Sequence, residues 1–217
     1  VRKALYDLAL EHRKKAINHI KCVAVTGSVG KTSTKDMIYS VLNTKYRVLK
    51  TEGNNNNHIG LPLTILRLKD EEVMILEMGM NNKGEISFLT DIARPTIGVI
   101  TNIGTAHIGN LGSRENIAKA KCEIVKYQRG KTFIAHDDEL IKKTVEFDGE
   151  KIFYSIKEVN VLERKANYSK FEYQNNVYEL NVGGDFNIEN ALSAINTGGK
   201  LGLTVREIQE GLKNYKP

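Results

Sequence analysis

The chain has 217 residues, of which 41% are hydrophobic and 27% charged, which is typical of a soluble domain with one sizeable core. No apolar run reaches the roughly 18 residues of a membrane span, the N-terminal residues lack the apolar core of a secretion signal, and two cysteines cannot make a disulfide framework. The net charge of +6 comes from basic residues scattered among acids, without an RNA-binding or zinc motif, so we expect a cytoplasmic protein that binds neither nucleic acid nor membranes.

The chain begins with a helical pattern near residues 2–18, and strand and helix patterns then alternate. Helices are indicated after the glycine turn "GSVGKTST" and at 84–93 and 113–128. Near-continuous apolar strands that alternate with helices are typical of an α/β domain, with a mostly parallel sheet flanked by helices on both faces. The apolar runs of strand length lie at 21–27, 46–51, 73–79, 96–103 and 131–136.

The pattern changes over residues 151–182, where "KIFYSI", "KFEYQ" and "VYELNV" alternate apolar and polar residues and "QNN" makes a plausible turn. We therefore expect a small antiparallel β appendage there. Helical patterns return at 186–201 and 204–214. Because the composition indicates no linker, we expect residues 1–217 to form a single domain.

The segment "VAVTGSVGKTST" joins a strand, a glycine turn and the start of a helix, as in a phosphate-binding P-loop. Gly27 and Gly30 would let backbone N–H groups surround phosphate oxygens, Lys31 would reach the β- and γ-phosphates, and the Thr32 hydroxyl would bind Mg²⁺. The common spacing has a further glycine where this chain has Val25, so a glycine turn with an incidental lysine is the alternative. The predicted nucleotide contacts are Gly27, Ser28, Val29, Gly30, Lys31, Thr32 and Ser33.

Three further polar features follow predicted strands. Glu77 closes the run "VMILEMG", at the strand end where α/β sheets bind ligands, and is either a Mg²⁺ ligand or a surface glutamate. The asparagines of "TEGNNNNHIGLP" either bind substrate or form turns and cap the next helix. His107, in "TNIGTAHIG", is either a metal ligand or an ordinary loop histidine.

Two classes of nucleotide-binding protein are excluded by missing motifs. The chain has no N-K-x-D sequence to recognise guanine, as a GTPase would need. It also has no G-x-G-x-x-G turn after the first strand, as a dehydrogenase would need. A kinase of small molecules is compatible with the P-loop alone.

The helical segment "ENIAKAKCEIV" (115–125) has a lysine where the core should be. Ile117, Ala120 and Ile124 belong to one apolar stripe, and Lys121 falls near its middle. Burial there would lower the pKa of the amine, because desolvation disfavours its charged form. The alternative is that the four-carbon stem lies on the core while the ammonium reaches water.

Several of these segments together resemble the Mur ligases, in the same order and at similar spacings from Val23 to the C-terminus. The motifs that carry the resemblance are "TGSVGKTST", "TEGNNNNHIGLPLT", "LEMGMNNKGEI", "TNIGTAHIGNLGSRENIAKAKCEI" and "NIENALSAI".

The resemblance implies an ATP-dependent amide ligase of peptidoglycan synthesis. In such an enzyme ATP phosphorylates the peptide carboxylate of UDP-N-acetylmuramoyl-tripeptide, and the amine of D-Ala-D-Ala attacks the resulting acyl phosphate. Two alternatives are another Mur-like amide ligase with a different acceptor and a nucleotide-binding module without catalysis.

The resemblance also implies roles for particular residues and a binding site for ATP with two Mg²⁺ ions. Lys121 matches a lysine that the family carbamylates. At Phe186, next to the expected adenine contacts, the chain departs from its relatives, which often have histidine there. The implied catalytic residues are Lys31, Glu77, His107 and Lys121; the implied metal ligands are Thr32, Glu77, His107 and carbamylated Lys121; and the further nucleotide contacts are Asn57, Asn187 and Asn190.

Mur ligases have three domains, and the resemblance covers the central, ATP-binding one. We therefore expect residues 1–217 to be a Mur-ligase central domain without the N-terminal UDP-sugar domain and the C-terminal domain. We expect a monomer that binds nucleotide weakly and has little ligase activity without those flanking domains.

Overall fold

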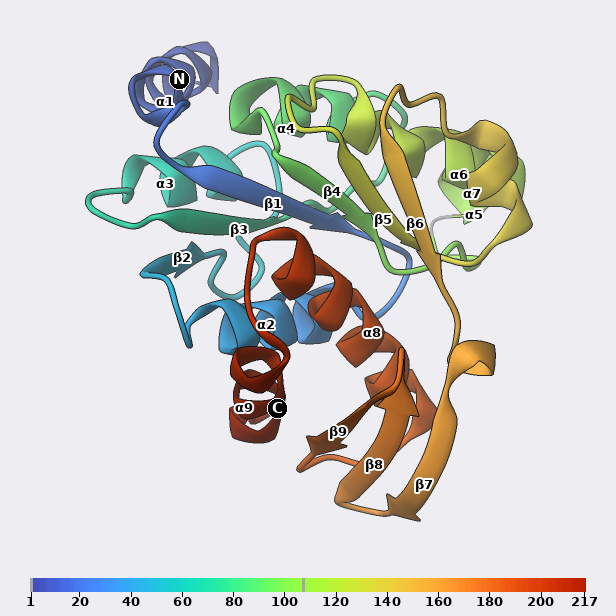
Figure 1. Ribbon diagram of the computed structural model, residues 1–217. Helices are drawn as coiled ribbons and strands as arrows, with labels where there is room; N and C mark the ends of the chain where they lie inside the picture. Colours follow the sequence, from blue (N-terminus) through green and yellow to red (C-terminus); the bar gives the residue numbers. More distant parts are fainter. Residues whose placement is uncertain (1, 107) are drawn as a thin grey trace.

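The computed structural model describes residues 2–106 and 108–217. A six-stranded, wholly parallel sheet forms its centre, in the order β2-β3-β1-β4-β5-β6 (Figure 1). The strands are β1 (Lys21–Thr26), β2 (Val48–Lys50), β3 (Val73–Glu77), β4 (Ile97–Ile100), β5 (Thr132–His136) and β6 (Glu150–Tyr154).

Helices cover both faces of this sheet, as Figure 1 shows. In β1, Cys22 and Ala24 belong to one core and Val23 and Val25 to the other, which explains the continuous apolar runs. No helix among the described residues has the length and apolarity needed to cross a membrane. The first face carries α1 (Arg2–Ala16), α3 (Gly60–Leu66), α4 (Glu85–Ala93), α6 (Arg114–Cys122) and α7 (Glu139–Thr144); the second carries α2 (Lys31–Leu42), α8 (Asp185–Lys200) and α9 (Val205–Asn214).

A small antiparallel sheet packs beside α8 and α9 (Figure 1). Its strands β8 and β9 are joined by a two-residue turn in which Gln174 and Asn175 have φ of 51° and 60°, as the tight turn of a twisted hairpin requires. Phe171 and Tyr178 extend the second core into this sheet. The strands are β7 (Asn160–Lys165), β8 (Tyr168–Tyr173) and β9 (Asn176–Leu180).

The α/β architecture and the antiparallel appendage are confirmed, but the placement of residues 151–156 in that appendage is wrong. Most of this segment lies in β6, which pairs in parallel with β5 at the edge of the main sheet. Its alternating pattern arises because an edge strand is only partly covered. The helix α7 makes the crossover that parallel pairing needs, and sequence analysis did not predict it.

Sequence analysis also did not predict β7, α5 (Ile108–Leu111) or the single turn η2 (Ile156–Glu158). The helix expected over 113–128 ends as α6 at Cys122 and continues only as the single turn η1 (Glu123–Val125).

Candidate functional site

The glycine turn lies at the carboxyl edge of the sheet, between β1 and α2. Gly30 occupies the position before α2 with φ 77°, a left-handed conformation that favours glycine. Gly27 packs so tightly that an added Cβ would lie 1.8 Å from Thr101 Oγ1. The first N–H groups of α2 have no acceptor within their own helix, so the turn provides the donors that an anion needs.

The segment after β4 holds the turn in this shape. The carbonyl oxygen of Val29 accepts hydrogen bonds from Thr101 Oγ1 at 2.7 Å and from Asn102 Nδ2 at 3.1 Å. The Ser28 hydroxyl, by contrast, accepts from the Gly104 N–H at 2.9 Å and is buried. Sequence analysis missed Thr101 and Asn102, although both stand in the quoted "TNIG" motif.

Thr32 and Glu77 meet beside the turn. Thr32 Oγ1 donates to Glu77 Oε2 at 3.0 Å, and Asn56 Nδ2 donates to Glu77 Oε1 at 2.9 Å. Lys35 Nζ lies 3.8 Å from the same carboxylate, which is only 2% exposed. A buried carboxylate that keeps its charge needs such partners. Sequence analysis missed Asn56 and Lys35.

This pair of oxygen donors fits a divalent cation that phosphate helps to hold. A hydroxyl and a carboxylate are the ligand types that Mg²⁺ prefers, and Mg²⁺ usually completes its shell with water and substrate phosphates. Among the residues that the structure describes, no group of three His, Cys, Asp or Glu could hold a metal ion by itself. Thr32 and Glu77 would therefore hold Mg²⁺ together with a nucleotide. His107 lies outside the described residues.

Lys121 is buried, with 2% exposure, and so does not extend to water. Its Nζ donates to the Gly27 carbonyl oxygen at 2.9 Å. Burial, followed by the positive charge of Lys31, lowers the pKa of Lys121 to about 7. Burial also lowers the pKa of Lys31, although Glu77 acts in the opposite direction. Near neutral pH, a large fraction of the Lys121 amine is therefore uncharged.

The expected adenine segment reaches the P-loop through α8. Asn190 Oδ1 accepts from Thr34 Oγ1 at 2.9 Å, and it lies 3.0 Å from where a Cβ on Gly30 would stand. Asn187, one turn earlier, donates its Nδ2 to the Gly183 carbonyl oxygen at 2.7 Å. Ser33 interacts with Tyr215, which follows α9. Of the two asparagines, Asn190 is the one that these contacts place beside the phosphate loop.

Asn57 has a structural role that sequence analysis left open. Its Oδ1 accepts from the N–H groups of Ile59 and Gly60, at 2.9 and 3.0 Å, where α3 begins. This matches the alternative in which the asparagines cap the next helix. Asn57 also lines the cavity described next, so the cap places it near the site.

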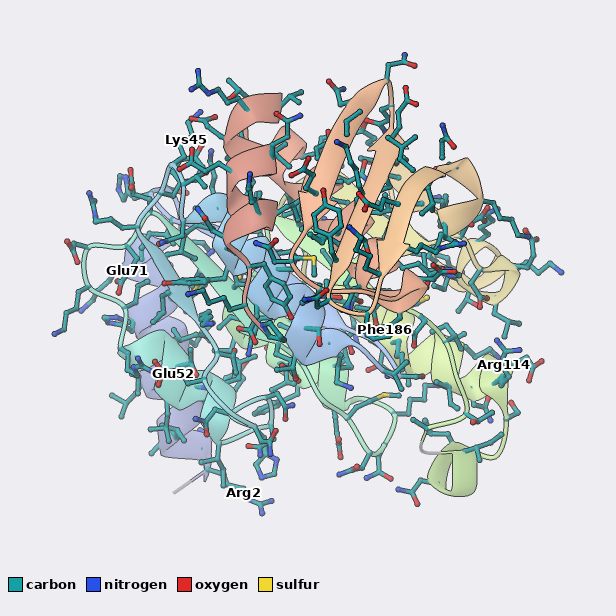
Figure 2. All side chains as sticks on the ribbon, turned by 90° about the horizontal axis from the view of Figure 1, so that it is seen from below. Arg2, Lys45, Glu52, Glu71, Arg114 and Phe186 are labelled. Atoms are coloured by element: carbon teal, nitrogen blue, oxygen red, sulfur yellow. The ribbon has the colours of Figure 1, made fainter. Side chains whose placement is uncertain are left out.

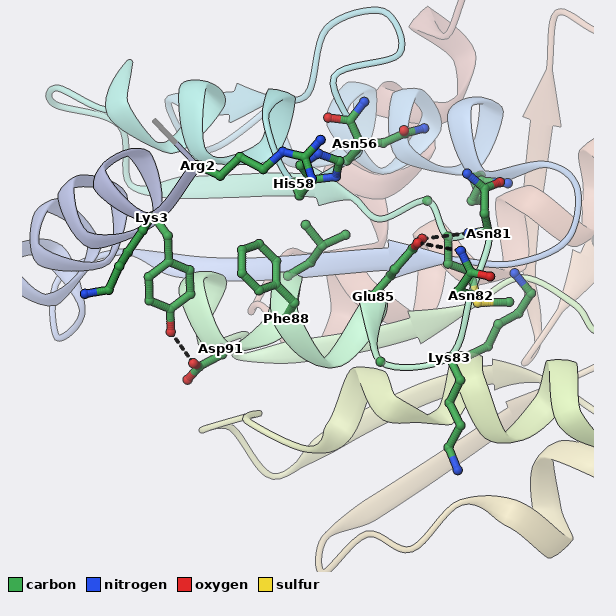
Figure 3. Close-up of a pocket in the computed structure, with 18 residues that line it drawn as sticks. Arg2, Lys3, Asn56, His58, Asn81, Asn82, Lys83, Glu85, Phe88 and Asp91 are labelled. Atoms are coloured by element: carbon green, nitrogen blue, oxygen red, sulfur yellow. Dashed lines mark hydrogen bonds between the residues drawn. The ribbon is translucent and has the colours of Figure 1, made fainter. Parts of the chain in front are cut away.

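A cavity of about 960 Å³ opens next to Lys31 and Lys121 and extends to α1 and α4 (Figure 3). Its walls are rich in basic and amide side chains, and Phe88 provides apolar surface. The two acidic residues that line it already have partners within the protein: Asp91 is paired with Tyr6 and Arg94, and Glu85 accepts from the Asn81 N–H and from Asn82 Nδ2. The cavity therefore suits an anionic ligand with amide groups, placed next to the P-loop lysine. The basic and amide residues are Arg2, Lys3, Lys31, Asn56, Asn57, His58, Asn81, Asn82, Lys83 and Lys121.

Comparisons with known proteins give consistent matches for the chain. The family model of the Mur ligase middle domain matches residues 25–198. The UDP-N-acetylmuramoyl-tripeptide–D-alanyl-D-alanine ligase of Bacillus subtilis is 40% identical over 205 residues, which cover 90% of this chain and 45% of that protein. The ligase of the same name from Synechocystis is 40% identical over 203 residues, which cover 89% of this chain and 43% of that protein.

Solved structures give the same result. MurF from Acinetobacter baumannii superposes with a TM-score of 0.90 at 29% identity, covering all of this chain and 50% of that one. MurF ligase from Thermotoga maritima, in complex with ADP, superposes with a TM-score of 0.86 at 31% identity. The match covers 100% of this chain and 52% of that one. The chain thus spans about half the length of the relatives it matches.

Proposed function

The chain belongs to the Mur ligase family through its middle domain, and on that premise we propose that it is the ATP-binding domain of a ligase that joins D-Ala-D-Ala to UDP-N-acetylmuramoyl-tripeptide. The observation that carries this proposal is the convergence of Lys31, Thr32, Glu77 and Lys121 at the carboxyl edge of the sheet. The ADP complex of the Thermotoga maritima relative supports nucleotide binding at this fold.

The proposed reaction has two steps. A carboxylate oxygen of the tripeptide attacks the γ-phosphorus of ATP, and ADP leaves. The amine of D-Ala-D-Ala then attacks the carbonyl carbon of the acyl phosphate, an amide bond forms, and phosphate and a proton leave. Activation is necessary because a free carboxylate is a poor electrophile.

The residues of this chain would mainly position groups and balance charge. The turn and the start of α2 hold phosphate oxygens by N–H donors, and Lys31 places its ammonium beside them. Thr32 and Glu77 would hold Mg²⁺, and the ion when bound would supply positive charge against the phosphates. The cavity next to Lys31 and Lys121 would take the acceptor carboxylate.

Carbamylated Lys121 belongs to the proposal as well. The uncharged amine forms a bond from Nζ to the carbon of CO₂ and releases a proton, which replaces a buried cation with an anion. That anion would lie near the Lys31 ammonium, since both Nζ atoms contact the Gly27 carbonyl oxygen. With His107 it would bind the second Mg²⁺ ion that the family resemblance implies.

We propose further that the complete enzyme is a cytoplasmic monomer in which N- and C-terminal domains flank these residues. The isolated chain would then bind nucleotide but catalyse little amide formation, because those domains contribute to the substrate sites.

A chimeric enzyme tests the function. Residues 25–198 replace the matching middle segment of the Bacillus subtilis relative, and ADP release is measured with UDP-N-acetylmuramoyl-tripeptide and several amine donors. The proposal predicts release that depends on D-Ala-D-Ala and is lost with Lys31→Ala. Release with another amine donor only would instead support a different Mur-like ligase, and a folded chimera without release would support a module without catalysis.

A further inference from the structure

Lys35 is a second buried lysine of the site, and the proposed reaction gives it no part. Charged side chains such as Lys45 and Glu52 lie at the surface of the molecule, as Figure 2 shows. Lys35, in α2, is only 2% exposed. Its Nζ lies 3.8 Å from Glu77 Oε2 and 3.5 Å from Asp36 Oδ1. Because a buried charge is costly unless it is paired, these two carboxylates keep the ammonium inside the protein.

The Lys35 ammonium faces the oxygen of Glu77 that lies next to Thr32. Thr32 and Lys35 are three residues apart in α2, so their side chains lie on one face of the helix. Both approach Glu77 Oε2, which is 3.0 Å from Thr32 Oγ1 and 3.8 Å from Lys35 Nζ. The other oxygen, Oε1, accepts from Asn56. A divalent ion held by Thr32 and Glu77 would therefore lie close to the Lys35 ammonium.

The charges around Glu77 are balanced without a metal ion. Asp36 is bound more closely by Lys50, whose Nζ lies 2.6 Å from Asp36 Oδ1, so Asp36 cannot neutralise Lys35 alone. The group has two ammonium groups and two carboxylates: Lys35, Lys50, Asp36 and Glu77. Lys31, which also interacts with Glu77, adds further positive charge. A divalent cation alone would meet repulsion here, because like charges repel strongly at short range in a buried site.

We propose that Lys35 is a built-in counter-ion of Glu77 that opposes Mg²⁺ binding until nucleotide phosphates are present, an inference that rests on the proposed nucleotide site. The phosphates bring the negative charge that offsets the repulsion between the ion and the ammonium. Lys35 is a positioning residue in this role, since it acts on the metal through Glu77. Nucleotide and metal ion consequently strengthen each other's binding by one common factor, and free Mg²⁺ binds the site only weakly.

Calorimetry on the 217-residue chain tests this with Mg²⁺ alone and with Mg²⁺ in the presence of ADP. Lys35→Met, which keeps an unbranched side chain but removes its charge, raises the affinity for Mg²⁺ alone by at least about tenfold. It also reduces the factor by which ADP strengthens Mg²⁺ binding. Lys35→Arg keeps the charge and therefore the values of the unaltered chain.

Lys50→Met is the matched control, because it removes the other ammonium of the same group. The Lys50 side chain is 31% exposed and is paired with Asp36. Its loss changes the affinity for Mg²⁺ alone by no more than about twofold, since a partly exposed charge is screened by water.

Thermal unfolding gives a second readout. Lys35→Met leaves the buried Glu77 carboxylate without its ammonium, which destabilises the chain. Mg²⁺ alone then restores stability to Lys35→Met and does not change the stability of the unaltered chain. The double variant Lys35→Met with Glu77→Gln has neither charge, so its stability does not respond to Mg²⁺.

The results distinguish this inference from the proposed nucleotide site. If the unaltered chain bound ADP with Mg²⁺ while Lys35→Met gained neither affinity for Mg²⁺ alone nor stability from it, the inference would be overturned and the nucleotide site would stand. If the unaltered chain did not bind ADP with Mg²⁺, the proposed nucleotide site would fail, and this inference with it.

Discussion

Lys31 and Lys121 donate hydrogen bonds to one acceptor, the Gly27 carbonyl oxygen, at 3.0 and 2.9 Å. One lysine comes from the phosphate loop and the other from a helix on the opposite face of the sheet. Burial makes the charged form of Lys121 costly, and repulsion from the nearby Lys31 ammonium adds to that cost. The site is therefore arranged to keep Lys121 partly uncharged.

The stability of the chain should reflect this low pKa. The pKa of Lys121 is about 7 in the folded chain against 10.5 as its ordinary value, so the unfolded chain binds more protons between these two pH values. The free energy of unfolding should consequently rise with pH across that window. Urea unfolding between pH 7 and 10 should show a steeper rise for the unaltered chain than for Lys121→Met.

Lys119→Met is the control for that experiment, since Lys119 is exposed on the same helix. It should keep the slope of the unaltered chain. Equal slopes for the unaltered chain and Lys121→Met would contradict the burial of a titrating amine at residue 121.

Carbamylation should be directly visible. In bicarbonate labelled with ¹³C, we expect a carbamate resonance from the unaltered chain, because an uncharged amine captures CO₂. Lys121→Ala should remove the resonance and Lys119→Ala should not. A spectrum without it, recorded with nucleotide and Mg²⁺ present, would exclude the modification in this chain.

The carboxylate of Glu77 should matter for metal-dependent binding. Glu77→Gln keeps the size of the side chain but removes the charge beside Thr32, so we expect at least about a tenfold loss of ATP affinity with Mg²⁺, or about 1.4 kcal/mol. Without Mg²⁺ the loss should disappear. Glu146→Gln, at an exposed site, should change neither the ATP affinity with Mg²⁺ nor the ATP affinity without it. A loss of the same size with and without Mg²⁺ would argue against the metal role.

The close contact of Gly27 with Thr101 should make this position intolerant of a side chain. A Cβ would lie 1.8 Å from Thr101 Oγ1, so Gly27→Ala should destabilise the chain by about 1–3 kcal/mol. Gly109→Ala is the control: a Cβ at Gly109 would have open space around it, so this substitution should lower the stability by less. Adding Thr101→Ala to Gly27→Ala should restore part of the stability that Gly27→Ala loses, as measured by thermal unfolding. If the stability losses of the two substitutions were instead strictly additive, the contact between Gly27 and Thr101 would be unimportant.

Local patterns in the sequence predict most of the fold but not its edges. Residues 21–27 and 73–79 have continuous apolar runs because both faces of β1 and β3 are covered. Residues 151–156 are misplaced because the partly exposed β6 has the alternating pattern of an antiparallel strand.

The residues of the candidate site likewise divide into those that local patterns predict and those that they do not. The apolar stripe around Lys121 predicts its burial, since helix periodicity is a local property. Asn56 and Asn57 are neighbours in a run of asparagines, yet one binds Glu77 and the other caps α3. Nothing in the run distinguishes them, because the difference depends on the position of β3. The roles of Glu77, Lys121 and the adenine contacts stay predictions.

The most direct test of the central claim is diffraction from crystals of the chain soaked with ADP and Mg²⁺. The account predicts phosphate density against the N–H groups of residues 27–33, with the metal about 2.1 Å from Thr32 Oγ1 and bound to Glu77 directly or through water. Nucleotide bound elsewhere, with this turn unoccupied at saturating ligand, would contradict it.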